Sequence, residues 1–122
     1  MQQTDEIQDE EIETTLFEII TQVGTARSLY IEATQAARAG DAPKAKEMIA
    51  QGAEAFNEGH SIHSELIRKV YSEGHEPVFQ NDGRVMLLTH AEDQLMSAEA
   101  FGILAEEFVA LYELLGSKGV LS

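Results

Sequence analysis

The sequence contains no cysteine and only two prolines, and its 8 lysine and arginine residues are outnumbered by 22 aspartate and glutamate residues. Without cysteine the chain can form no disulfide and no cysteine-based zinc site. This fits a reducing compartment, and we expect the protein to be cytoplasmic. The net charge of −14 disfavours nucleic acid and anionic membrane surfaces as partners, because both are bound through lysine and arginine.

Long hydrophobic runs are also missing. No segment is long enough to span a bilayer, and the acidic N-terminus lacks the basic and apolar regions of a signal peptide. Residues 1–13 carry six acids and no base. We therefore expect residues 1–12 to form a disordered acidic tail, with a recruiting role as the alternative. The length of 122 residues predicts one domain, which we place at residues 13–116.

Apolar residues follow the i, i+3, i+4 spacing of amphipathic helices in three stretches, at about 12–39, 42–72 and 83–115. Gly40 and Asp41 suit the end of the first helix and the cap of the second. Their short connection makes these two helices antiparallel neighbours. Residues 73–83 form the one loop, and no segment alternates like a half-buried strand. The sequence thus predicts an all-α fold, a three-helix antiparallel bundle.

The third helix carries a polar cluster, His90 with Glu92, Asp93 and Gln94, inside an apolar run. His90, Asp93 and Gln94 stand at i, i+3 and i+4 and so share one side of the helix. The apolar residues that follow are too many for one stripe: Phe101, Ile103, Leu104, Phe108, Val109, Leu111, Tyr112, Leu114 and Leu115. A helix that is apolar on more than one face is buried on more than one face. We therefore expect it to contact its own bundle and another subunit.

Residues 90–96, His-Ala-Glu-Asp-Gln-Leu-Met, resemble the His-Ala-Gln-Asp-His-Leu-Met motif of a known family. These are the enzyme IIA components of the lactose/cellobiose (N,N'-diacetylchitobiose) class of the bacterial sugar phosphotransferase system. The resemblance runs from about Leu16 to Leu115 and includes residues 16–20, 24–28, 40–41 and 60–67. Two departures stand out: Glu92 replaces the glutamine of the motif, and Gln94 replaces its second histidine.

The resemblance implies that His90 carries a phosphoryl group. The protein would be a phosphotransferase component that takes the group from phospho-HPr and passes it to a IIB component. That IIB would serve uptake of a β-glucoside, chitobiose or lactose-type sugar. A neutral imidazole suits this role, because its nitrogen is nucleophilic at neutral pH. We expect His90 to lie in a water-poor setting, with Gln94 and Glu92 as supporting residues.

The resemblance also implies a homotrimer in which Asp93 of three copies meets at the axis. Such a ring of like charges is costly unless a cation binds it, and Mg²⁺ suits a site built of oxygen ligands and water. An Asp93 that is hydrogen-bonded at the interface without metal is the alternative. For the whole protein, the alternative is a structural or regulatory helical module that transfers no phosphoryl group. The missing second histidine favours that alternative.

Some residues of the first two helices have two interpretations. Gly24 predicts a close approach between helices rather than a functional role. Arg27 could approach a phosphoryl group, but a surface ion pair is the simpler expectation. His60 and His63, at i and i+3, can bind a metal, but polar groups hydrogen-bonded between helices are the commoner case.

Overall fold

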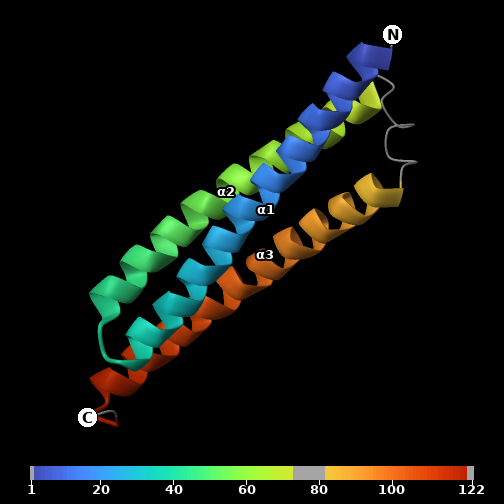
Figure 1. Ribbon diagram of the computed structural model, residues 1–122. Coiled ribbons are helices and arrows are strands. Elements are labelled where there is room, and N and C mark those ends of the chain that lie inside the picture. Colours follow the sequence, from blue (N-terminus) through green and yellow to red (C-terminus); the bar gives the residue numbers. More distant parts are fainter. Residues whose placement is uncertain (1, 73–81, 121–122) are drawn as a thin grey trace.

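The computed structural model describes residues 2–72 and 82–120, with side chains from residue 10 to 72 and from 83 to 120. These residues form three α-helices and no β-strand: α1 (Gln2–Arg38), α2 (Ala42–Ser72) and α3 (Asp82–Ser117). The predicted all-α fold of three helices is confirmed. Figure 1 shows an elongated bundle in which α1 and α3 begin at the same end and α2 runs the other way. Within the described residues, no helix is long and apolar enough to cross a membrane.

Each helix turns a stripe of small and apolar residues toward the core. Its positions are spaced alternately by three and four residues, and this seven-residue repeat keeps the stripe facing its neighbours along the whole helix. In α2 the stripe includes two glycines, and in α3 it includes one. The buried apolar residues are Ile12, Leu16, Ile19, Val23, Ala26, Tyr30, Ala33 and Ala37 of α1, Ala45, Leu66 and Val70 of α2, and Ala91, Leu95, Ala98, Ala105 and Val109 of α3.

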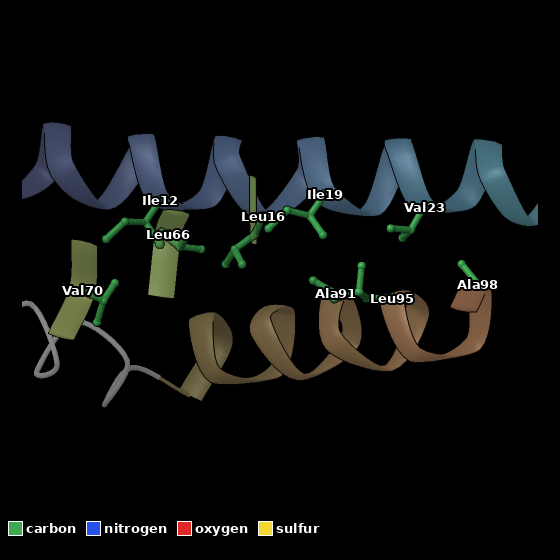
Figure 2. Packing of buried hydrophobic residues seen from close by; sticks show 9 residues of the cluster. All are labelled: Ile12, Leu16, Ile19, Val23, Leu66, Val70, Ala91, Leu95 and Ala98. Carbon is green, nitrogen blue, oxygen red and sulfur yellow. The ribbon is translucent and has the colours of Figure 1, made fainter. Parts of the chain in front are cut away.

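The largest cluster of buried residues lies in the half of the bundle where α1 and α3 begin. Figure 2 shows Leu16, Ile19 and Val23 of α1 pointing toward α3, where Ala91 and Leu95 face them. The three α1 side chains are fully buried, and burial of such a side chain contributes about 1.5–3 kcal/mol. This packing fixes the rotation of α3 about its axis, and thereby the direction in which the polar residues near Ala91 point.

The ring of Tyr30 lies between α2 and α3 at two glycines. A Cβ atom at Gly52 would lie 2.7 Å from Cε1 of the ring, and one at Gly102 would lie 2.9 Å from its Cε2. Both positions therefore require glycine, because no larger residue fits without a shift. Burial, with a smaller contribution from the charge of Glu106, raises the pKa of the Tyr30 hydroxyl.

The connection between α1 and α2 has the predicted chemistry. Gly40 has a positive φ of 88°, a conformation that glycine adopts at the lowest cost. The amide of Gly40 donates to the carbonyl of Ala37 at 3.0 Å, and that of Asp41 donates to the carbonyl of Ala36 at 2.9 Å. The Asp41 carboxylate then accepts a hydrogen bond from the Lys44 amide at 3.1 Å. Gly40 ends α1 and Asp41 caps α2, as the sequence predicts.

The structure differs from the sequence-based expectations at two places. Helix α1 begins at Gln2, so residues 2–12 of the expected disordered tail are helical. Glutamate and glutamine are good helix formers, and acids are favourable near a helix N-terminus. At Gly24 a Cβ would meet nothing within 4 Å, so the expected close approach within the chain is wrong there. Most of the expected loop at residues 73–83, including His75, lies outside the described residues.

Candidate functional site

His90 lies on the exposed side of α3, directly before the buried Ala91. Because successive residues of a helix differ by about 100° in direction, the burial of Ala91 turns His90 outward. No hydrogen bond or ion pair joins its imidazole to another side chain of the described part of the chain. The water-poor setting expected for His90 is therefore not present within a single chain. The imidazole is open to an incoming partner.

Gln94 lies one helical turn after His90 and is half-buried. Its side-chain oxygen Oε1 accepts a hydrogen bond from Nη1 of Arg27 on α1 at 3.1 Å. The guanidinium group of Arg27 also lies over the ring of Phe101, 5.2 Å from its centre. Arg27 thus forms an amide contact and a cation–π contact in place of the expected surface ion pair.

Glu92 points to another side of α3, because it stands at i+2 from His90. Its Oε2 lies 2.8 Å from Nε2 of His63 on α2, and the imidazole of His63 is largely buried. The carboxylate that departs from the family motif is therefore engaged by α2. Glu92 and His90 are not brought together within the chain, although the sequence groups them. The expected role of His63 as a polar group between helices is confirmed, whereas the exposed His60 stacks on the ring of Phe56.

Asp93 is exposed, on the side of α3 that faces away from the core. The same outer surface carries large apolar side chains that are 44–73% exposed: Met86, Met96, Ile103, Leu104, Phe108, Leu111 and Leu114. Among the described residues, no three histidine, aspartate or glutamate side chains lie close enough together to hold a metal ion. Neither the Asp93 region nor the His60 and His63 pair of one chain supports metal binding.

The contacts of Arg27 and His63 were not visible in the spacing of the sequence. Arg27 and Gln94 are 67 residues apart, and His63 and Glu92 are 29 residues apart. Local periodicity predicts which face of a helix is apolar, but it does not predict which charged residue of one helix meets which polar residue of another. The only signal was the presence of Arg27 as the one basic residue among the first 37.

Known proteins share this sequence pattern. Residues 14–113 match the family described as "PTS system, Lactose/Cellobiose specific IIA subunit". The chain is 34% identical over 105 residues to the lichenan-specific phosphotransferase enzyme IIA component of Bacillus subtilis (strain 168), which covers 86% of this chain and 90% of that protein. It is 35% identical over 106 residues to the N,N'-diacetylchitobiose-specific EIIA component of Escherichia coli (strain K12), with coverage of 87% and 86%.

The three-dimensional arrangement is shared as well. The chain matches the crystal structure of the PTS cellobiose-specific enzyme IIA from Bacillus anthracis with a TM-score of 0.78 and 36% identity, covering 88% of this chain and 93% of that one. The family match includes all of α2, most of α1 and α3, and His90. The resemblance seen in residues 90–96 is confirmed, and the chain belongs to the lactose/cellobiose-specific enzyme IIA family of the bacterial sugar phosphotransferase system.

Proposed function

We propose that this protein is a phosphocarrier that accepts a phosphoryl group on His90 from phospho-HPr and passes it to a IIB component. The observation that carries the proposal is the exposed imidazole of His90, within the family motif and one turn from the amide of Gln94. An acceptor must meet two partners in turn, and a side chain on the outside of a rigid helix is open to both. Phosphoryl transfer depends mainly on positioning and on stabilisation of charge.

In the proposed reaction, a neutral nitrogen of His90 attacks the phosphorus atom of the phosphohistidine of HPr. The new N–P bond forms as the old one breaks. The other ring nitrogen of the donor phosphohistidine carries a proton, so the histidine of HPr leaves as a neutral imidazole, and the second ring nitrogen of His90 keeps its own proton. A cysteine thiolate of IIB then attacks the same phosphorus atom, forming an S–P bond and returning His90 to its starting state. The chain acts as a carrier and is regenerated after each cycle.

The names of the relatives support a proposal for the class of sugar. Their names specify lichenan, N,N'-diacetylchitobiose and cellobiose, and others specify oligo-β-mannoside and lactose. We infer that the IIB partner serves a permease for a β-glucoside, chitobiose or lactose-type sugar. The net charge of −14 favours partners whose docking surfaces are basic.

We further propose that three copies assemble around the outer surface of α3. Seven exposed apolar residues lie there, from Met86 to Leu114, and groups of exposed apolar side chains often mark sites of protein association. Assembly on this surface would bury it, and would supply the water-poor surroundings that His90 lacks in one chain. In a symmetric assembly the same face of each copy contributes equally.

A bound Mg²⁺ is proposed only for such an assembly, because one chain offers no group of three metal-binding side chains in its described part. Asp93 lies on the outer surface of α3, so three copies could supply three carboxylates. If so, Mg²⁺ should raise the thermal midpoint of the wild type, and Asp93→Asn should abolish that increase. A wild-type midpoint that responds to neither Mg²⁺ nor chelator would remove the metal from the proposal.

The carrier function is tested by incubation with labelled phospho-HPr. His90→Ala should lose labelling while its helical spectrum stays unchanged, and His60→Gln, His63→Gln and His75→Gln should each retain labelling at least in part. The linkage should be labile in acid and stable in alkali, as a phosphoramidate is. Labelling of His90→Ala would assign the phosphoryl group to another side chain. A wild type that no HPr labels would favour the non-transferring structural or regulatory module.

A further inference from the structure

We propose that Arg27 is a positioning residue for the phosphoryl site: by holding the amide oxygen of Gln94, it leaves the amide NH₂ group available to an anion on His90. This inference rests on the proposed carrier function, since it concerns the same site. Arg27 itself forms no bond to phosphorus and exchanges no proton.

Nη1 of Arg27 and Oε1 of Gln94 lie 3.1 Å apart, and the chemistry of the two groups fixes which atoms can meet. A guanidinium group only donates hydrogen bonds, whereas an amide has one end that accepts and one that donates. Arg27 can therefore bind only the oxygen of Gln94. The partner determines the orientation of the amide, and the NH₂ group points elsewhere.

Arg27 is itself held in place by its surroundings. Its guanidinium group is held over the ring of Phe101 at 5.2 Å, and the residue is half-buried between α1 and α3. Cation–π contacts of this kind contribute about 0.5–2 kcal/mol. No carboxylate of the described chain pairs with Arg27, so its positive charge remains available to the surroundings of Gln94.

Gln94 stands one helical turn after His90. Residues at i and i+4 are neighbours on a helix surface, with Cβ atoms about 6 Å apart, so the Gln94 amide is within reach of a phosphoryl group on His90. An outward oxygen would repel the phosphoryl oxygens, whereas an outward NH₂ would donate to them. The family motif has a histidine at this position, and the glutamine needs a fixed orientation to act reliably as a donor.

Substitutions of Arg27 by side chains that only donate hydrogen bonds are compared with substitutions by side chains that both donate and accept them. Arg27→Lys keeps a group that only donates, whereas Arg27→Gln can bind either end of the Gln94 amide and so releases its orientation. Arg27→Met removes hydrogen bonding and keeps the apolar stem. Lys46→Met is the matched control, because Lys46 pairs with Glu113 at the other end of the bundle.

The protein is phosphorylated chemically with phosphoramidate, and the side-chain NH₂ signals of Gln94 are followed by ¹⁵N NMR. In the wild type these signals should shift on phosphorylation. Arg27→Gln and Arg27→Met should lose most of the shift, Arg27→Lys should keep much of it, and Lys46→Met should match the wild type. The rate of labelling by phospho-HPr should fall roughly three- to tenfold in Arg27→Gln, as expected for loss of one hydrogen bond.

A second comparison separates positioning from a general loss of charge. In a Gln94→Ala background, Arg27→Gln should cause no further fall in the labelling rate. Unchanged Gln94 signals in Arg27→Gln, or equal effects of Arg27→Gln with and without Gln94, would overturn the inference. Failure of wild-type labelling by HPr, with a normal Gln94 shift after chemical phosphorylation, would refute the carrier function and leave the positioning by Arg27 intact.

Discussion

The carboxylate of Glu92 and the imidazole of His63 meet at 2.8 Å across the contact between α3 and α2. This pair accounts for one of the two departures from the family motif, because the extra carboxylate is directed to α2 and away from the side of α3 that carries His90. It also links two helices whose mutual packing is less extensive than their packing on α1.

We expect the pair to contribute a measurable but small coupling to stability. A double-mutant cycle of Glu92→Gln and His63→Gln, followed by urea unfolding near neutral pH, should give a coupling of about 0.3–1 kcal/mol, because Glu92 remains 42% exposed. The single variant Glu92→Gln should also leave labelling of His90 by phospho-HPr largely unchanged. A coupling indistinguishable from zero would mean that the contact adds nothing to the bundle.

Substitution of the glycines that face Tyr30 should destabilise the protein. Gly102→Ala places a methyl group 2.9 Å from the ring, and forcing such a contact typically costs about 1–3 kcal/mol. Gly24→Ala is the matched control, since its Cβ meets open space and alanine favours a helix by about 1 kcal/mol. Thermal midpoints should fall for the first variant and rise or hold for the second; equal shifts would contradict the packing described here.

Because the pKa of Tyr30 is raised, the stability of the folded protein should vary with pH in the alkaline range. The folded protein holds the phenolic proton of Tyr30 more tightly than the unfolded chain does, because the pKa of Tyr30 is raised on folding above the ordinary tyrosine value of about 10. The contribution is therefore complete below that pH and is lost as the pH rises through the higher folded-state pKa. The stability of Tyr30→Phe should therefore fall less steeply with rising pH than that of the wild type. Urea unfolding midpoints measured from about pH 8 to 11 check this.

Assembly should depend on the outer surface of α3. Light scattering of the wild type is expected to return three times the chain mass. In Leu111→Lys the measured mass should fall toward that of a single chain, because a charge at a buried interface is unfavourable. Tyr71→Lys, at an exposed residue of α2, serves as the control. A monomeric wild type would disprove the trimer and remove the metal proposal with it.

Removal of residues 1–9 should change the thermal midpoint little. Ile12 is the first buried residue among those whose side chains the structure describes. The deleted segment contains only two apolar residues, Met1 and Ile7, so it has little apolar surface to bury. The expected loss is about one kcal/mol or less. A much larger loss would show that this part of α1 packs on the bundle.

The sequence was sufficient for the number of helices, their approximate bounds and the turn at Gly40, because periodicity and cap chemistry act locally. The motif also singled out His90, whose side chain lies exposed on α3. It failed at Gly24, where a glycine inside a helix can mark either a close approach or open space. It did not pair Arg27 with Gln94, since contacts between distant residues depend on how the helices rotate against one another.

The seven-residue repeat creates an ambiguity that the glycines remove. If α3 slid along α1 by one repeat, an apolar stripe would still face the core. Tyr30 would then meet Leu95 or Val109 in place of Gly102, and neither leaves room for the ring.

The same holds for α2. A slide in one direction would bring Ala45 against Tyr30, and a slide in the other would bring Leu66 against Val23, where Gly59 now lies. Helices with a uniform repeat are prone to such shifted alignments. The residues with the smallest side chains thus select one alignment from several that hydrophobic burial alone would accept, and with it the pairing of Arg27 with Gln94.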